Sequence, residues 1–340
     1  MTIVHELSID TIHYVPNSIK EAIVNNTPIE DKLHVIAVIS NPCLYQKRYT
    51  LMKEFIKRMD MEEPNVILYV VEMIYDNQSF VITDKTNKRH LQLHTTHPLW
   101  HKENMINLGV KYLLPINWKA FAWIDSDLAF ESTTWAMDTL KILHGAKDIV
   151  QLFSHCVDMN QTESAMTIFT SAGHQYCKSL QSLSSSLYCG SGSGKGIHFW
   201  HPGFAWAMTR TAYDKIGGLY EDAILGSGDN IMLYSLLGNG IKAINHKSTD
   251  DYKQSIVSFQ QKIKYLRFGY TPGVIRHYFH GHKKNRKYME RWQILIKHHF
   301  SPLKHLQKDS YGILIPSSSF PTQLQQDIVH YFQQRNEDEE

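Results

Sequence analysis

Two carboxylates one residue apart end an apolar segment of this 340-residue chain. In the stretch AFAWIDSDLAFEST they are Asp125 and Asp127, placed directly after FAWI. On a turn, two such carboxylates can converge on one divalent cation, and Mg²⁺ and Mn²⁺ both accept oxygen ligands. Mg²⁺ usually keeps several waters and binds one or two carboxylates together with substrate phosphates. Capping or turn acids ahead of Ser132 are the ordinary alternative, which spacing alone does not exclude.

The acidic tail NEDEE repeats this spacing with Glu337 and Glu339. A run of charges is usually a solvated face, and we expect a solvated, charged tail here. Because the spacing is the same in both pairs, the elements that position Asp125 and Asp127 must decide their chemistry.

The chain around Asp125 and Asp127 predicts alternating strands and helices. Apolar, β-branched runs predict buried strands at 33–40, 65–73, 91–96, 121–125, 148–153 and 203–210. Helical periodicity predicts helices at 45–60, 97–114 and 132–145. This alternation is typical of an α/β protein with a mostly parallel sheet covered by helices on both faces. In such a sheet ligands bind at the carboxyl ends of the strands, which is where Asp125 and Asp127 fall.

Regular structure is predicted less densely in the second half of the chain. No regular element is expected over 154–200, where SLQSLSSSLYCGSGSGKG (179–196) predicts a long mobile loop that closes over a substrate. That loop lacks the GxxxxGK[ST] spacing of a phosphate-binding loop. Further on we expect an edge strand at 241–245, a helix at 255–268 and a strand at 274–282.

A second group of residues with chemical potential lies in HPGFAWAMTRTAYDKIGGLYEDAILGSGDNIM, residues 201–232. Glu221 follows a Gly-Gly turn, and Gly226-Ser227-Gly228 precedes Asp229. An acid at the start of a helix is ordinarily a cap that complements the helix dipole. A cap does not need glycines beside it, whereas a bulky substrate lying against the chain does.

A third group lies in HYFHGHKKNRKYMER, with His277, His280 and His282 at the predicted end of a strand. If the strand stays extended, His280 and His282 share a face. One histidine added to the two carboxylates would complete a protein ligand set for a divalent metal. The cations that follow suit a diphosphate, or else form a solvated basic face: Lys283, Lys284, Arg286 and Lys287.

Composition limits the classes of function. The chain is 43% hydrophobic and 20% charged, with a net charge of +2, so neither a nucleic-acid surface nor a polybasic membrane anchor is indicated. No apolar run approaches the roughly 20 residues that span a bilayer, and the N-terminal sequence lacks the apolar core of a signal peptide. Four cysteines without a CxxC pair argue against a zinc ribbon and favour a reduced, cytoplasmic protein.

Taken in order, these motifs resemble the GT-A class of nucleotide-sugar-dependent glycosyltransferases. The order is an SNP turn (Ser40-Asn41-Pro42), WHKEN (100–104), the DxD of FAWIDSD, the HPGFAWAMTR…GGLYE…GSGDNIM block and a last strand with His-Gly. The soluble transferases of large DNA viruses and some bacteria are the most similar, and the resemblance covers roughly residues 33–292. It implies a GT-A (Rossmann-like) fold and a metal cofactor, Mn²⁺ or Mg²⁺. It also implies transfer of a sugar from a nucleotide-diphosphate donor, by family habit a UDP-sugar, to a hydroxyl of a glycan or glycoconjugate.

The resemblance also implies roles for individual residues. The metal set would be Asp125, Asp127 and His280, with His282 as the rival of His280. The donor-binding set would be Ser40, Asn41, Glu72, Lys102, Asn104, Asp125 and Ser126. The acceptor-binding set would be Trp200, His201, Gly203, Gly226, Ser227 and Gly228. Asp229 would remove the acceptor proton in an inverting enzyme, whereas in a retaining one Asp229 or Glu221 would position the acceptor.

The same resemblance implies one catalytic domain over residues 1–300 and a C-terminal helical arm or tail over 301–340. The nucleotide-sugar half would be about 33–130 and the acceptor half about 131–300. Two other classes stay open. A nucleotidyltransferase also pairs carboxylates with Mg²⁺, but SNPCLYQKR lacks the Gly-rich, basic signature expected near its first strand. An inactive nucleotide- or carbohydrate-binding module would keep the fold without needing the full set of acids and histidine.

Overall fold

The computed structural model describes residues 3–4, 7–8, 18–178, 183 and 199–339. Its centre is a seven-stranded sheet with the order β13-β8-β12-β6-β3-β4-β5. In this order the strands are Phe268–Tyr270, Ile149–Gln151, Ala205–Thr209, Ala120–Ile124, Leu33–Ser40, Val66–Tyr75 and His90–Thr95. Every neighbouring pair is parallel except those of β12, which runs antiparallel to β6 and β8. The predicted α/β class with a mostly parallel sheet is therefore confirmed.

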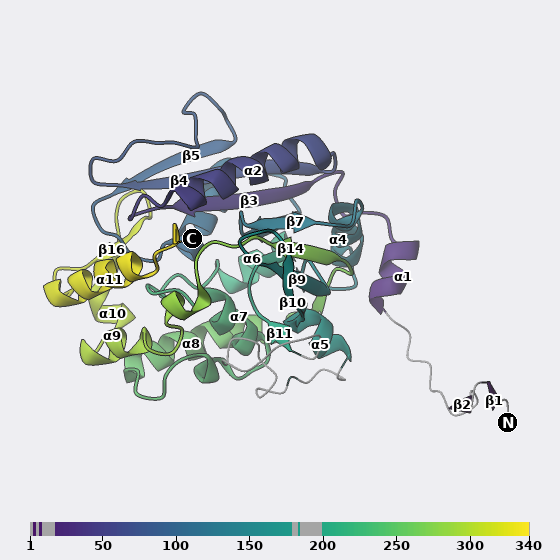
Figure 1. Cartoon of the computed structure of the whole chain (residues 1–340). Helices are drawn as coiled ribbons and strands as arrows, with labels where there is room; N and C mark the ends of the chain where they lie inside the picture. Colours follow the sequence, from purple (N-terminus) through teal and green to yellow (C-terminus); the bar gives the residue numbers. More distant parts are fainter. Residues whose placement is uncertain (1–2, 5–6, 9–17, 179–182, 184–198, 340) are drawn as a thin grey trace.

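Helices cover both faces of this sheet (Figure 1). On one face lie α1 (Ser18–Asn25), α2 (Gln46–Glu62) and α4 (Trp135–Leu143). On the other lie α3 (Lys102–Leu113), α6 (Arg210–Ile216), α7 (Gly228–Leu236) and α8 (Asp250–Ile263).

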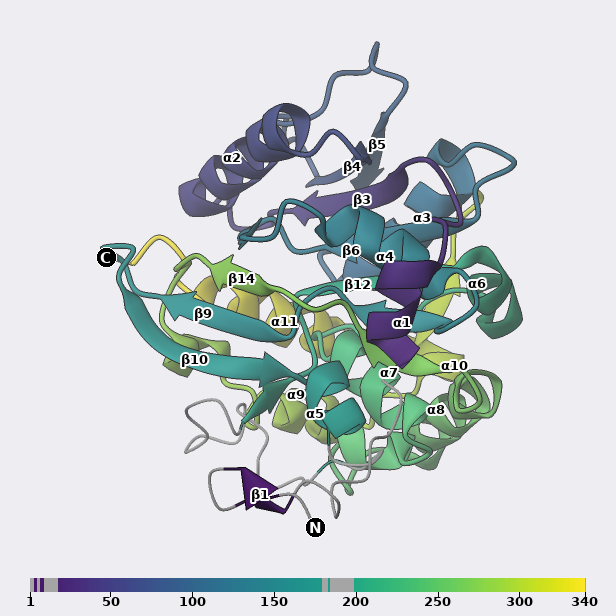
Figure 2. The same ribbon diagram turned by 90° about the vertical axis from the view of Figure 1, so that its right-hand side faces the viewer.

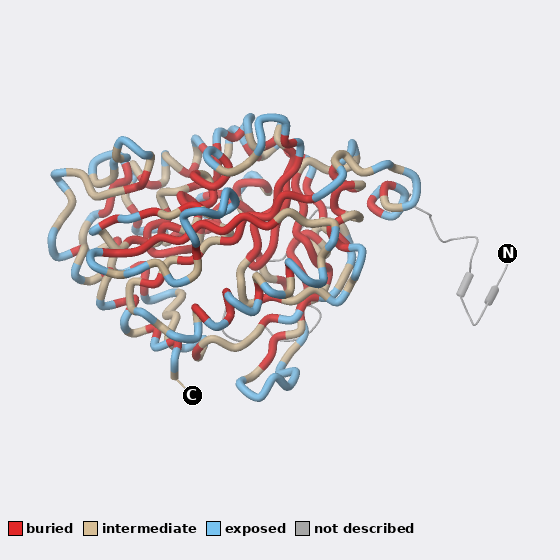
Figure 3. Tube along the Cα trace, turned by 90° about the horizontal axis from the view of Figure 1, so that it is seen from above, coloured by how far each residue is buried: buried red, intermediate tan, exposed pale blue. Residues whose placement is uncertain are grey.

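The strands alternate between these two cores, as the period of two requires. In β6, Ala122 packs with the α2 side and Phe121 and Trp123 with the α3 side. Seen from above, the buried parts of the chain gather along the strands in the centre (Figure 3). This double burial explains why the strands are continuously apolar in sequence.

A second, five-stranded sheet lies beside the first, in the order β11-β10-β9-β14-β7 (Figure 2). Its strands are Trp200–His201, Ala165–Ser171, His155–Met159, Val274–His277 and Leu128–Phe130. Strands β9 and β10 and helix α5 (Ala172–Lys178) fall where no regular element was expected, so that expectation is wrong. Much of β10 is exposed, and a short exposed strand has no apolar run to reveal it. The predicted mobile loop at 179–196 lies, apart from residue 183, outside the described residues.

Two predicted strand assignments need correction. Residues 241–245 form no edge strand, because Gly240–Ala243 is a 3₁₀ helix between α7 and α8. The Gly240 N–H donates to the side chain of Gln260 in α8, which draws the segment away from the sheet. The strand expected at 274–282 ends at His277, and Gly281 has a φ of 88°. His280 and His282 are therefore not held by an extended strand.

The last 40 residues return to the body of the protein. They form α10 (Pro302–His305), the hairpin of β15 (Leu306–Lys308) and β16 (Leu314–Pro316), and α11 (Thr322–Gln334). Ile328 and Tyr331 of α11 are buried in the core that holds α3. The chain then reaches α2 (Figure 1), and Glu337 is only 3% exposed. The expectation of a solvated tail is thus wrong for Glu337. In the part of the chain that the structure describes, no helix has the length and apolarity to cross a membrane.

Candidate active site

A cavity of about 420 Å³ opens at the carboxyl ends of β3 and β6. Many residues predicted for the site line it: Ser40, Lys102, Asp125, Ser126, Asp127, His201, Ser227, Asp229 and His280. They come from the end of β3, the start of α3, the turn after β6, strand β11, the start of α7 and the segment after β14. The two sheets and the helix starts therefore bring together residues that are far apart in the sequence.

The metal-like cluster is Asp127, His277 and His280, whose candidate ligand atoms all lie within 4.8 Å of one another. Asp127 Oδ2 lies 2.7 Å from His280 Nε2 and 3.5 Å from His277 Nε2. Strand pairing produces this proximity, because β14 runs antiparallel to β7 with His277 opposite Leu128. The Tyr278 N–H also donates to the Asp127 carbonyl at 2.8 Å.

This cluster fits a divalent metal. Asp127 Oδ1 is buried and has no hydrogen-bond partner, which is costly unless a ligand satisfies it. His277 Nδ1 pairs with Asp158 Oδ1 at 2.7 Å, which leaves Nε2 directed towards Asp127. One carboxylate and two imidazoles suit a transition metal such as Mn²⁺ better than Mg²⁺, which prefers oxygen ligands. Burial opposes the negative charge of Asp127, but His277 and His280 hold its pKa well below the usual value.

Asp125 has a different partner. Its carboxylate forms an ion pair with Lys102, from the first turn of α3, while its N–H donates to the Phe204 carbonyl at 2.9 Å. Burial raises the pKa of Asp125, and the charge of Lys102 opposes this rise. The two carboxylates thus line the same cavity, with Asp127 directed to the histidines and Asp125 to the lysine.

Asp229 lies in the first turn of α7, after Ser227 at a φ of 83°. The neighbouring glycines make room for carboxylates. A Cβ on Gly203 would lie 2.5 Å from Asp229 Oδ2, and one on Gly228 would lie 2.2 Å from Glu103 Oε1. A side chain at Gly203 or Gly228 would therefore displace one of these two carboxylates.

Glu103 is a cavity residue that sequence reasoning missed. Its side chain is 7% exposed, and Oε2 has no hydrogen-bond partner. Burial raises the pKa of Glu103 to about 8; Lys102 opposes this rise and Asp229 adds to it. Its place next to Lys102 in WHKEN was the available signal, but a buried glutamate in a helix start is indistinguishable from a solvated one in sequence.

Cations from distant segments also line the cavity. Lys283 and Arg286 were predicted as diphosphate-binding cations. Arg48, Arg291 and Arg335 were missed, because they come from α2, the start of α9 (Trp292–Lys297) and the C-terminal segment. No local pattern marks these three arginines, since only the tertiary fold brings them to the cavity.

Several predicted donor-binding residues lie outside the cavity lining. Asn41 bonds through its side chain to both the N–H and the carbonyl of Tyr45. Glu72 lies inside β4, not beyond its end, and its carboxylate accepts the N–H groups of residues 81–83. Its oxygens are therefore occupied by a loop, which it fixes to the sheet.

Asn104 and Glu221 also belong to a structural network. Asn104 Nδ2 donates to Glu221 Oε2 at 2.9 Å, and Lys308 lies 2.8 Å from the same oxygen. Asn104 Oδ1 accepts from the Leu314 N–H. This network joins α3 to the C-terminal hairpin. Trp200 packs in the core beside Tyr234, and Gly226 accommodates Trp100 and Arg291 rather than lining the cavity.

His282, the predicted rival of His280, precedes a 3₁₀ helix, Lys283–Arg286, and its ring packs on Phe279. It does not join the cluster around Asp127. The second histidine of the cluster is instead His277, the last residue of β14.

Comparison with known proteins places the chain in no family, since no family model and no curated protein matches it. Among solved structures, it is similar to the catalytic domain of Drosophila β1,4-galactosyltransferase 7 in complex with xylobiose. The identity is 9% and the TM-score 0.31, over 71% of this chain and 65% of the other, just under two thirds of its length. A second is the mannosyltransferase PcManGT from Pyrobaculum calidifontis in complex with GDP-Man and Mn²⁺. Here the identity is 12% and the TM-score 0.39, over 83% of this chain and 67% of the other.

Both similar structures are glycosyltransferases. At such low identities and TM-scores the similarity carries no argument about activity. The functional argument rests on the cavity and its residues.

Proposed function

We propose that this protein is a metal-dependent glycosyltransferase that moves a sugar from a nucleotide-diphosphate donor, a UDP-sugar, to a hydroxyl of a glycan or glycoconjugate. One observation carries the proposal. The cluster of Asp127, His277 and His280, with an unsatisfied buried Asp127 oxygen, shares one cavity with Asp229 and Glu103. A metal, a diphosphate and an acceptor hydroxyl would each find complementary groups there.

Asp127, His277 and His280 would hold Mn²⁺. When bound, the metal supplies Lewis-acid stabilisation of the diphosphate as it leaves. Lys283 and Arg286 line the same cavity and add positive charge towards the phosphates. Ser40, at the end of β3, and Asp125 line the same cavity and would bind the nucleoside and its ribose.

Asp229 would serve as the general base towards the acceptor hydroxyl, which inverts the anomeric centre. Its side chain lies in the first turn of α7 and lines the cavity. Burial raises the pKa of Glu103 to about 8, which favours its neutral form beside Asp229 at neutral pH. A neutral carboxyl can also donate a hydrogen bond to the acceptor.

The metal site is tested by calorimetry of UDP binding with and without Mn²⁺. Asp127→Ala should abolish Mn²⁺-dependent binding, because it removes the carboxylate of the cluster. Asp214→Ala, at an exposed position on α6 outside the cavity lining, is the matched control and should bind as the wild type does. Unchanged affinity in Asp127→Ala would exclude the proposed metal site.

The base is tested separately. A thermal-shift screen of nucleotide-sugars with Mn²⁺ identifies the donor. Asp229→Asn should then keep donor affinity and lose transfer by about 10²-fold or more, the usual contribution of a general base. Turnover retained in this variant would show that Asp229 is not the base.

A further inference from the structure

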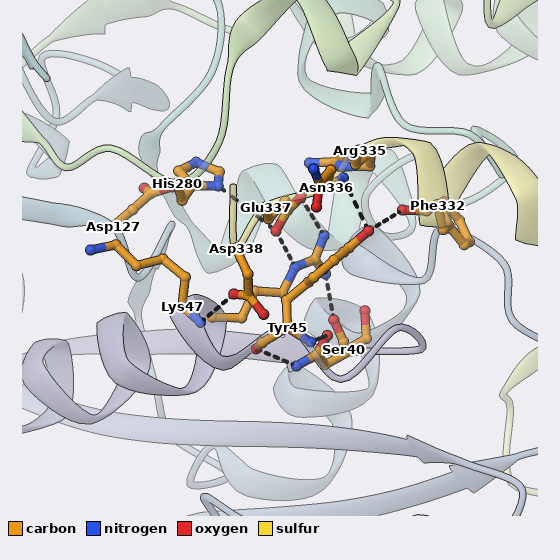
Figure 4. A network of polar contacts seen from close by, with 12 residues as sticks. Ser40, Tyr45, Lys47, Asp127, His280, Phe332, Arg335, Asn336, Glu337 and Asp338 are labelled. Carbon is orange, nitrogen blue, oxygen red and sulfur yellow. Dashed lines mark hydrogen bonds and ion pairs between the residues drawn. The ribbon is translucent and has the colours of Figure 1, made fainter. Parts of the chain in front are cut away.

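The C-terminal segment, residues 335–339, is fastened beside the cavity (Figure 4). The Tyr45 hydroxyl accepts the Asn336 N–H at 3.1 Å and lies 2.9 Å from the Phe332 carbonyl. Asp338 accepts the N–H groups of residues 46 and 47, at 2.9 and 2.8 Å. A carboxylate at the start of α2 is favoured by the helix dipole. The backbone is thus held on both sides of Glu337.

The Glu337 side chain is enclosed by two arginines. Arg48 donates to it through Nε and Nη2, the latter at 2.8 Å, and Arg335 donates through Nε at 2.7 Å. Arg48 also donates to the Ser40 carbonyl at 2.6 Å, so the same guanidinium reaches the end of β3. Glu337 is the acidic member of a cluster that links α2, β3 and the C-terminal segment.

Glu337 also faces the metal-like cluster. Its Oε2 lies 3.9 Å from His280 Nδ1, an ion-pair distance, while His280 Nε2 faces Asp127 at 2.7 Å. Arg286 Nη2 lies 2.6 Å from His280 Nε2 and 3.2 Å from Nδ1, so this guanidinium must move away from Nε2 when a metal binds there. A guanidinium has no acceptor and cannot take the Nδ1 proton. When Nε2 binds a metal, Nδ1 carries the ring proton, and Glu337 is the acceptor placed behind it.

The second histidine of the cluster also has a carboxylate behind it. Asp158 lies at hydrogen-bond distance, 2.7 Å from His277 Nδ1, whereas Glu337 lies at the longer ion-pair distance of 3.9 Å from His280 Nδ1. Histidines that ligate metals commonly donate their other N–H to a carboxylate, which fixes the ring orientation. Two histidines with two carboxylates behind them form a complete set of this kind.

We propose that Glu337 is a positioning residue of the metal site, which orients His280 from the C-terminal segment and couples docking of residues 335–339 to metal binding. The proposal rests on the metal site of the proposed function. It adds a contribution from a segment that lies outside the resemblance seen in the sequence.

The test is isothermal calorimetry with Mn²⁺ alone on the full chain. Glu337→Gln should weaken Mn²⁺ binding by roughly 10- to 100-fold, the usual effect of removing a carboxylate behind a ligand histidine. The matched control is Glu339→Gln, whose carboxylate accepts from Asn285 at 2.7 Å and does not line the cavity. That control should bind within twofold of the wild type.

A second readout separates positioning from a general loss of stability. Hydrogen exchange of the backbone at 335–339 should slow when Mn²⁺ is added to the wild type, and should not change in Asp127→Ala. If Glu337→Gln does not fold, Glu337→Asp keeps the charge but withdraws it by one methylene, and should still weaken Mn²⁺ binding several-fold.

The outcomes are distinct. A wild type that binds no Mn²⁺ overturns the proposed function together with this inference. A wild type that binds Mn²⁺, with Glu337→Gln or Glu337→Asp equal to it in affinity, overturns the role of Glu337 alone. Exchange at 335–339 that ignores Mn²⁺ overturns the coupling.

Discussion

Two buried glutamates line the same cavity, and their pKa values are shifted in opposite directions. Glu103 is 7% exposed and Glu337 is 3% exposed. Glu103 has one oxygen without a partner, and burial raises its pKa to about 8. Burial also opposes the charge of Glu337, but Arg48 and Arg335 outweigh it and hold the pKa of Glu337 well below its usual value.

The difference shows that burial does not decide the charge of a carboxyl; its partners do. Lys102, the cation nearest to Glu103 in sequence, is committed to Asp125. Glu337 instead pairs with the guanidiniums of Arg48 and Arg335. Within the described residues, neither arginine forms an ion pair with another acidic side chain. Opposite pH dependences follow from this comparison.

The largest effect is expected for Glu337→Gln at neutral pH. The change leaves Arg48 and Arg335 buried without their carboxylate, and breaking a buried ion pair in this way costs about 3–5 kcal/mol of unfolding free energy. Because the folded pKa is depressed, the stabilisation is present above about pH 4.5 and is lost as the pH falls towards the folded pKa. Denaturant unfolding should show the gap between variant and wild type narrowing in acid. A gap that is constant from pH 7 to pH 3 would contradict this.

Next in size is Glu103→Gln, which copies the protonated carboxyl. The folded protein keeps this proton up to about pH 8, whereas the unfolded chain releases it near 4.5. Between these values the unfolded chain binds fewer protons, so this group makes the unfolding free energy fall as pH rises, by up to about 1.4 kcal/mol per pH unit. Unfolding curves at pH 5, 6, 7 and 8 should show that the unfolding free energy of the variant lacks this decrease with rising pH. If the unfolding free energies of variant and wild type had equal slopes against pH, the Glu103 carboxyl would have to be charged in the folded protein and stabilised by a partner.

A smaller effect is expected for Arg48→Lys. Lysine keeps the positive charge but cannot make the two parallel bonds to Glu337 and the third bond to Ser40. We expect a loss of about 2 kcal/mol in unfolding free energy, the size of a hydrogen bond to a charged group. A loss equal to that of Glu337→Gln would mean that charge matters less than geometry here.

The smallest effect is expected for Glu339→Gln. Glu339 lies two residues after Glu337, the same spacing as between Asp125 and Asp127. It is only half-buried, and its carboxylate accepts a hydrogen bond from Asn285. Its substitution should change the unfolding free energy by no more than about 0.5 kcal/mol. A larger loss in thermal or denaturant unfolding would show that the whole tail, rather than Glu337, supports the cavity.

Sequence alone predicted six of the seven strands of the main sheet, most of which are buried on both faces and stand out as apolar runs; it missed β13, a three-residue edge strand. It missed β9, a five-residue strand of mixed polar and apolar residues, β10, whose first half is largely exposed, and the 3₁₀ helix at Gly240–Ala243, which packs between α7 and α8. Apolar runs in the sequence identified strands best where both faces of the sheet are buried.

For the site, the strand and glycine contexts correctly singled out Asp125, Asp127 and Asp229 as cavity residues. The sequence left the choice between His280 and His282 open and did not propose His277, because that choice depends on where β14 ends. Glu337 was out of reach, because its partner Arg48 is 289 residues away and no local pattern records that pairing.

The row of residues across β9, β14 and β7 has a consequence for engineering this protein. Asp158, His277 and Leu128 stand opposite one another on adjacent strands, next to Asp127. A strand turns its side chains to alternate faces, so one inserted or deleted residue in β14 would exchange the outward and inward sets. The proposed metal ligands therefore depend on strand register. We expect the cluster to tolerate insertions in loops that precede β14, but not the insertion or deletion of a single residue within β14.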